Sequence, residues 1–183
     1  LDDEGNLIIL EMGNNNGAYQ EYTLRAYNET GAKWARSLET HYGSPIRNNY
    51  PVLIDTYDNK TELLITTKTN IKYDSQTISC PPNSQENVCH IWFSVDSEGL
   101  KASQTKVKYT SMEFVDLAVG EQGAYVLGTT RDHVRENNGQ SNFSGFISDY
   151  GVYTAYVAML QRDGSWAFNV DIADDSNNDL VEF

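Results

Sequence analysis

Apolar and polar residues alternate along most of the chain, and the period of the alternation is two residues. No stretch keeps a 3.6-residue period over three turns, so the pattern favours strands over helices. The predicted strands are residues 7–12, 21–27, 33–38, 51–57, 62–69, 88–95, 103–109, 113–119, 124–130, 154–160, 166–172 and 179–183. Turns that carry Gly, Asn or Asp separate many of them, at 4–6, 29–31, 58–59, 97–99, 121–123 and 162–164. The sequence therefore predicts an all-β protein.

The strands form an internal repeat. Three ten-residue segments match one another: 22–31 (YTLRAYNETG), 90–99 (HIWFSVDSEG) and 155–164 (AYVAMLQRDG). Their final glycines, at positions 31, 99 and 164, recur after 68 and 65 residues. The strand before each segment also recurs, at 6–10, 62–66 and 124–128, and a similar opening strand appears at 112–116 and 179–183.

Each unit of the repeat is expected to contain four antiparallel strands, namely an opening, a second, a third and a fourth strand. Turns join the first pair and the last pair, and a loop joins the second strand to the third. This order is typical of a β-propeller blade. We expect one β-repeat domain over residues 1–183, with units at about 1–50, 51–111 and 112–178 and with residues 179–183 opening a further unit.

The last unit resembles the repeat of the bacterial-type SBBP β-propeller proteins. The resemblance rests on residues 153–168 (YTAYVAMLQRDGSWAF) and 174–183 (DDSNNDLVEF), which follow the family order of aromatic-rich strand, Asp/Gly turn, Trp-bearing strand, polar loop and further strand. Residues 32–36 (AKWAR) repeat the Trp part in the first unit, whereas the middle unit has LKAS at 100–103 and no Trp there. About two of the three units match. The resemblance implies a structural repeat and no catalytic residue.

Three units are too few for a closed propeller, which typically has four to eight blades. The alternatives are a twelve-stranded β-sandwich, a fragment of a longer propeller, and an open stack that other chains complete. The sequence ends in an opening strand, residues 179–183, and begins with a unit that lacks one before residues 7–12. If these segments pair between molecules, the contact is head to tail and builds a ring or a filament.

The charge balance narrows the classes of partner. The chain has 13 basic and 26 acidic residues, a formal net charge of -13 at pH 7. Nucleic-acid phosphates and anionic lipids need basic surfaces, so we expect no binding to either. No apolar run approaches the roughly 20 residues that span a bilayer, and we expect no membrane insertion. The sequence opens at Leu1 without a basic-then-apolar leader, so a signal peptide is expected to have been removed or to lie outside it.

Three signals agree on an extracellular or cell-surface location. The chain has 17 Asn and 12 Tyr but only 7 Lys, a surface composition more typical of secreted proteins. Three N-x-S/T sequons fall in predicted turns or loops, so glycans are expected at Asn28, Asn59 and Asn142. Cys80 and Cys89 bracket a polar loop. We expect a disulfide between them, because two free thiols or half of a metal site fit the spacing less well.

Candidate catalytic chemistry is sparse. His41, His90 and His133 lack a second His at metal-ligand spacing, and each is interpreted as an ordinary strand or loop residue. There is no nucleophile elbow, phosphate loop or dinucleotide fingerprint. Carboxylates are so abundant that no glycosidase pair stands out. The loop from Asp171 to Asp179 is rich in Asp and Asn but lacks the EF-hand register, and calcium binding there stays open.

Three tryptophans complete the candidates. Trp34, Trp92 and Trp166 could stack on a sugar, but Trp34 and Trp166 occupy similar repeat positions, which favours packing between units. The prediction is therefore an extracellular, glycosylated, non-enzymatic structural protein without cofactor. It is expected to assemble with copies of itself or with neighbouring repeats, as a filament or surface layer. The alternative is a carbohydrate- or calcium-binding propeller fragment of a larger ectodomain.

Overall fold

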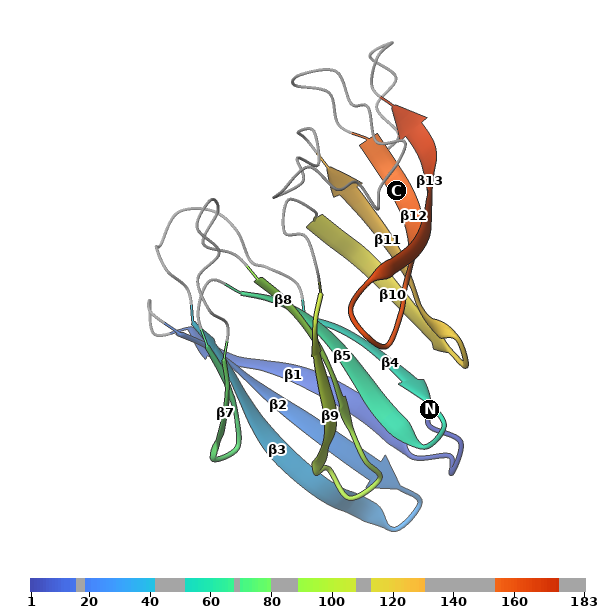
Figure 1. Ribbon diagram of the computed structural model, residues 1–183. Coiled ribbons are helices and arrows are strands. Elements are labelled where there is room, and N and C mark those ends of the chain that lie inside the picture. The colour runs from blue at the N-terminus through green and yellow to red at the C-terminus, as the bar shows by residue number, and fades with distance from the viewer. Residues whose placement is uncertain are drawn as a thin grey trace. The chain divides into compact units, whose positions relative to one another are not determined.

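The computed structural model describes residues 1–15, 19–41, 52–67, 70–79, 89–107, 113–130 and 154–174 (Figure 1). Within these ranges the chain forms strands and no helix, which confirms the all-β prediction. The described residues contain no helix that is long and apolar enough to cross a membrane. The chain divides into two compact units, Leu1–Lys106 and Val107–Phe183.

The strands make three antiparallel sheets. The first has the order β1-β2-β3-β6-β7, from β1 (Leu7–Asn15), β2 (Tyr19–Asn28), β3 (Gly31–His41), β6 (Ile71–Tyr73) and β7 (Gln76–Ile78). The second has the order β4-β5-β8-β9, from β4 (Val52–Tyr57), β5 (Lys60–Thr67), β8 (Cys89–Val95) and β9 (Lys101–Lys106). The third has the order β10-β11-β12-β13, from β10 (Glu113–Gly120), β11 (Gly123–Thr130), β12 (Thr154–Leu160) and β13 (Trp166–Asp174).

The first compact unit, Leu1–Lys106, consists of the first two sheets, which share one hydrophobic core. We call this compact unit the first unit, and we call the units of the repeat the repeat units. Alternate residues of the central strands β5 and β8 point into it, among them Leu63, Ile65, Ile91 and Phe93. The facing sheet contributes side chains from β2, β3 and the β6–β7 hairpin: Tyr22, Leu24, Leu38, Ile71, Tyr73 and Ile78. Tyr73 meets Phe93 edge-on with ring centroids 5.4 Å apart, so aromatic packing joins the two sheets.

The second compact unit, Val107–Phe183, contains the third sheet, in which the strands follow one another in chain order. Its central strands carry buried side chains at alternate positions, Ala124 and Val126 on β11 and Tyr156 and Ala158 on β12. Register shifts interrupt β10–β11 between Phe114 and Asp116 and also occur twice in β12–β13. Such bulges increase the local twist of a sheet.

The predicted repeat is visible in the strand pairing. The three recurring second strands are β1, β5 and β11, and they pair antiparallel with β2, β8 and β12, which carry the matching ten-residue segments. Four-stranded units are confirmed for the second and third sheets. None of the three sheets closes on itself within the described ranges, and a closed propeller is not seen.

The first sheet departs from the predicted unit. It has three consecutive strands and then the β6–β7 hairpin, which pairs with β3 through Leu38 and Glu39. Residues 71–78 were expected within the second unit of the repeat and in no strand. The segment is too short for alternation to identify it, and Asp74, at φ +49°, turns the chain between its strands. Predicted strand 179–183 lies outside the described residues.

Candidate functional site: a turn clamped between two sheets

The β8–β9 hairpin turn, residues 96–99, organises the polar contacts of the first unit. Asp96 N–H donates to the Leu100 carbonyl at 2.8 Å, and Gly99 N–H donates to the Asp96 carbonyl at 2.9 Å. The Asp96 carboxylate accepts hydrogen bonds from the backbone N–H of Glu98 at 3.0 Å and of Leu100 at 2.8 Å. Gly99 has φ +76°, a left-handed conformation that glycine adopts without steric cost. The sequence therefore builds a rigid turn with its carbonyls directed outward.

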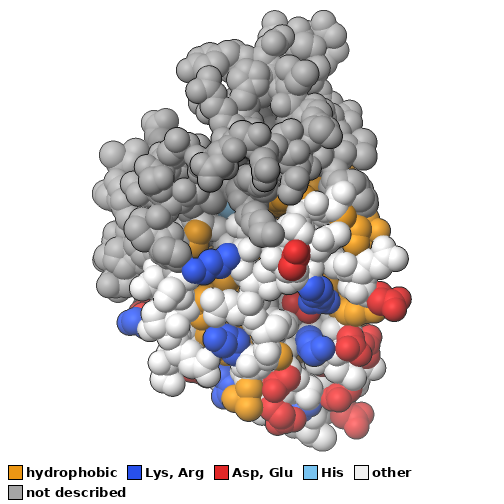
Figure 2. All heavy atoms as spheres, viewed as in Figure 1, with side chains coloured by type: hydrophobic (Ala, Val, Ile, Leu, Met, Phe, Trp, Pro, Cys, Tyr) orange, Lys and Arg blue, Asp and Glu red, His pale blue; other side chains and the backbone are white. Residues whose placement is uncertain are grey.

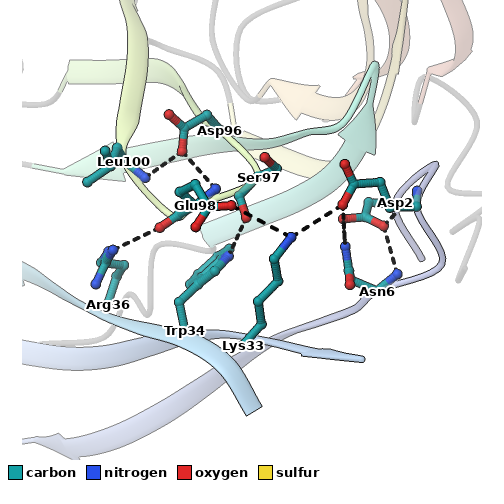
Figure 3. Close-up of polar contacts among 10 residues, drawn as sticks. Asp2, Asn6, Lys33, Trp34, Arg36, Asp96, Ser97, Glu98 and Leu100 are labelled. Carbon is teal, nitrogen blue, oxygen red and sulfur yellow. Dashed lines mark hydrogen bonds and ion pairs between the residues drawn. The ribbon is translucent and has the colours of Figure 1, made fainter. Parts of the chain in front are cut away.

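Two side chains of β3 bind this turn from the facing sheet (Figure 3). Trp34 donates from Nε1 to the Ser97 carbonyl at 2.8 Å. Arg36 donates from Nε to the Gly99 carbonyl at 2.9 Å and from Nη2 to the Glu98 carbonyl at 2.8 Å. Three consecutive carbonyls of a β8–β9 turn are thus satisfied by two residues that alternate along one strand.

Tyr73, from β6, donates a further hydrogen bond from its hydroxyl to the Gly99 carbonyl at 2.8 Å. Burial raises the pKa of Tyr73, and the neighbouring Asp74 carboxylate raises it further. The phenol therefore stays protonated and remains a donor. We call the 96–99 turn together with Trp34, Arg36 and Tyr73 the turn clamp.

Close packing makes the turn clamp specific for glycine at its last position. A Cβ atom on Gly99 would lie 2.8 Å from Cδ2 of Trp34 and 3.0 Å from Nε of Arg36. Glycine is thus needed at this position both for its backbone conformation and for the approach of the indole ring.

A second turn of the same geometry lies at residues 2–5. Asp2 N–H donates to the Asn6 carbonyl and Gly5 N–H donates to the Asp2 carbonyl, both at 3.0 Å, and Gly5 has φ +80°. The Asp2 carboxylate accepts from the backbone N–H of Glu4 and Asn6, as the Asp96 carboxylate does in the turn clamp. The side-chain amide of Asn6 also donates to Asp2, at 2.7 Å (Figure 3).

Lys33 lies between the two turns. Its Nζ is 3.3 Å from a carboxylate oxygen of Glu4 and 3.9 Å from one of Glu98, the third residues of the two turns. On the face shown in Figure 2, both acidic and basic side chains are exposed among the described residues. Both glutamates are substantially exposed, so each ion pair contributes little to stability. The hydrogen bonds from Trp34, Arg36 and Tyr73 to backbone carbonyls join the two sheets more directly than these exposed ion pairs do.

Two buried polar pairs lie on β5 and β8, on the face opposite the core of the first unit. Glu62, only 1% exposed, accepts a hydrogen bond from Nε1 of Trp92 at 2.8 Å. On the same face, Oγ1 of Thr66 lies 2.7 Å from Nδ1 of the buried His90. Sequence reasoning missed Glu62, although a carboxylate beside a run of apolar residues in a strand was a signal for it. Both pairs have the hydrogen-bonded character of structural polar groups.

The predicted glycosylation sites lie in turns where they are described. Asn28 is exposed at the end of β2, and its side-chain oxygen accepts from the backbone N–H and the hydroxyl of Thr30 at 2.9 and 2.6 Å. Asn59 is exposed in the β4–β5 turn with φ +55°. Asn142 lies outside the described residues, and the presence of glycans stays a prediction.

The remaining candidates have different outcomes. Cys89 is buried at the start of β8, while Cys80 lies outside the described residues, so their disulfide stays a prediction. His41 ends β3, and His133 lies outside the described residues. Within the described ranges, no three His, Cys, Asp or Glu side chains gather in a way that could hold a metal ion. Part of the loop from Asp171 to Asp179 is beyond those ranges, so calcium binding there is not tested.

The tryptophans do not share one role. Trp34 binds the turn of the facing sheet, as expected for packing between units. Trp166 packs against Phe114 of its own sheet, with ring centroids 6.1 Å apart. Trp34 lies three residues after Gly31 and pairs with Ala26. Trp166 lies two residues after Gly164 and pairs with Leu160. The two positions are therefore offset by one residue, because the turns before them differ in length.

Comparison with known proteins adds no family to these findings. No protein-family model matches the chain, and a search of the curated proteins finds no match.

Proposed function

We propose that the chain is an extracellular, glycosylated structural protein built of β-propeller-like repeats, which assembles head to tail with copies of itself. Assembly as a filament or a surface layer follows from such a contact, because a head-to-tail interface that does not close propagates without limit. The role needs neither a catalytic centre nor a cofactor.

The turn clamp is the observation that carries the proposal. It joins the fourth strand of one repeat unit to the turn between the third and fourth strands of the next unit, through Trp34, Arg36 and the carbonyls of residues 97–99. Each unit of the repeat has a fourth strand and a turn before it, although the middle unit has no Trp at the place of Trp34. Contacts of this kind join neighbouring units, and similar units can extend them from one molecule to another.

The surface supports an extracellular location. Asn28 and Asn59 are both exposed in tight turns, where a glycan projects into solvent without displacing packed side chains. A net charge of -13 keeps separate assemblies soluble and limits non-specific association.

Sedimentation velocity and electron microscopy test the proposal. The full chain, purified with its native glycans, is expected to sediment as species whose mass grows with protein concentration, and negative staining is expected to show rows or rings of similar particles. Enzymatic removal of the glycans serves as the control for association through carbohydrate. A single compact monomer at every concentration, with and without glycans, would contradict the proposal.

A further inference from the structure

The 2–5 turn is a hairpin turn by its geometry. It shares its two backbone hydrogen bonds with the turns at 96–99 and 161–164, and the glycines of the three turns have φ +80°, +76° and +81°. At the two later turns the residue before the turn ends a strand, and it pairs with a residue of the strand that follows: Val95 with Lys101 and Leu160 with Trp166. A turn of this type normally connects two antiparallel strands.

The residues at equivalent places around the 2–5 turn are exposed. Leu1 corresponds to Val95 and Leu160, which are 0% exposed, yet Leu1 itself is 79% exposed. Leu7 and Met12, at either end of the apolar part of β1, are 47% and 68% exposed. These three residues make up half of the large exposed hydrophobic side chains of the described residues. Leu7 and Met12 point to opposite faces of β1, so the exposed apolar side chains lie on both sides of this outer strand, as expected where a further strand would cover it.

Among the described residues, no strand pairs with the edge of β1 that faces away from β2. The Asn6 carbonyl accepts a hydrogen bond from the Asp2 N–H on this edge. The direction of backbone groups alternates from residue to residue along a strand, so the N–H and carbonyl groups of Ile8 and Leu10 also point towards this edge. Two of the other outer strands carry features that discourage pairing, since β9 begins and ends with Lys and β7 has only three residues. The outer strands β4, β10 and β13 contain no Lys, Arg or Pro, and β1 is like them in this respect. The sequence of β1, LIILEMGNN, contains no Lys, Arg or Pro.

The other two sheets show what occupies this edge. In them the opening strand lies antiparallel on the outer edge of the second strand, as β4 on β5 and β10 on β11. The strand β1 is the second strand of its unit and has no such neighbour in the described ranges. The 2–5 turn stands where the turn between opening and second strand stands in the complete units.

We infer that the edge of β1 that pairs with no strand in the described ranges binds residues 179–183 (DLVEF) of a second copy of the chain as an antiparallel opening strand. The inference rests on the proposed function and assigns its interface. Residues 179–183 resemble the start of the third unit at 112–116 (MEFVD), part of which is the opening strand β10. The predicted segment is therefore an opening strand, and β1 is the second strand of the one unit that shows no opening strand in the described ranges.

The alternation of side chains selects a register. Ile8 and Leu10 pack against the core of the first unit, so core-facing partners must be apolar. Pairing all five residues with 8–12 places Phe183 opposite Ile8 and Val181 opposite Leu10, and it directs Glu182 to the solvent side opposite Ile9. Shifting the strand by one residue would place Glu182 and Leu180 over the core instead.

Disulfide trapping between two single variants tests the interface on the full chain. Ile9→Cys and Glu182→Cys are purified separately, mixed and oxidised, and the joined peptides are identified by mass spectrometry. In the proposed register, positions 9 and 182 lie opposite each other and share no backbone hydrogen bond. The Cβ atoms of such a pair are about 4.5–5.5 Å apart, which is near the separation in a disulfide. Ile8→Cys mixed with Glu182→Cys is the matched control, and it should give about tenfold less joined peptide because its side chain faces the core.

The outcomes separate the two proposals. A joined 9–182 peptide in the mixture, in excess over the control, supports the interface. Concentration-dependent assembly of the wild-type chain without that peptide overturns the interface and leaves the proposed function standing. A wild-type monomer with no joined peptide overturns both. A double variant that joins positions 9 and 182 only within single molecules, with no joining in the mixture, shows that the strand pairs within its own chain and overturns the role of a second copy.

Discussion

Trp34 lies so close to Gly99 that a Cβ atom on the glycine would come within 2.8 Å of the indole ring. The two residues are 65 positions apart, Trp34 on β3 of one sheet and Gly99 in the β8–β9 turn of the other. Their contact places the Nε1 donor of Trp34 at the Ser97 carbonyl. The contact joins two neighbouring repeat units, because a side chain of one sheet binds the turn of the other.

Replacement of Gly99 by Ala should destabilise the first unit more than the same replacement at Gly5. Both glycines have positive φ, which costs about 1–2 kcal/mol for Ala, but Gly5 has no atom within 4 Å of the added Cβ. At Gly99 the clash with Trp34 should add about 1–3 kcal/mol. Urea unfolding followed by circular dichroism measures both variants, and equal losses would contradict the packing role of Gly99.

Tyr73 should make the stability of the first unit depend on pH above neutrality. Its pKa is raised in the folded chain, so the folded state keeps the proton while the unfolded state loses it near pH 10. The stabilisation is fully present below about pH 10 and falls as the pH rises towards the folded pKa.

Tyr73→Phe provides the measurement, since it removes the titrating group together with a hydrogen bond worth about 1 kcal/mol. The difference in unfolding free energy between wild type and variant should shrink between pH 8 and pH 10.5. Ionisation of the other tyrosines is common to both proteins and cancels. A difference that stays constant over this range would contradict the protected state of the phenol.

Glu62 should matter as the acceptor for Trp92 and less as a charge. Glu62→Leu removes the acceptor from the buried Nε1–H, which costs about 1–3 kcal/mol when no other group replaces it. Glu62→Gln keeps an oxygen in the same place and should lose less. Thermal unfolding and the tryptophan emission spectrum, to which Trp92 contributes, measure the two variants. If the Gln variant is the less stable one, the carboxylate charge itself is needed.

The disulfide between Cys80 and Cys89 should be present and stabilising. Closing so short a loop should contribute about 2–3 kcal/mol by restricting the unfolded chain. Mass spectrometry after alkylation without reductant gives the readout, with a reduced sample as the control. Both thiols alkylated under these conditions would exclude the bond and weaken the extracellular assignment.

At least two of Asn28, Asn59 and Asn142 should carry glycans in material from the native source. Glycopeptide mass spectrometry identifies the occupied sites, and Thr30→Ala and Thr61→Ala remove the first two sequons while keeping each Asn. Unmodified peptides at all three positions would leave the Asn-rich surface without this explanation.

The local pattern of the sequence was sufficient for the strands and their repeat. Every strand predicted from the period-two alternation that falls in the described ranges is a strand in the structure. The turns at Gly31, Gly99 and Gly164 could be predicted because glycine permits positive φ. Alternation did not reveal the β6–β7 hairpin, since each of its strands has only three residues. Strand pairing over such a short segment depends on the sheet that receives it.

Only the tertiary structure decided which residues form the candidate site. Trp34 was noticed as a repeated Trp and the 97–99 segment as a turn, but nothing local indicates that the indole binds the Ser97 carbonyl. Arg36 and Tyr73 were not distinguished from ordinary strand residues, because their roles depend on a turn at least 23 positions away in the sequence. Strand formation follows from neighbouring residues, whereas the fit of one sheet against another depends on contacts that close only when the chain folds.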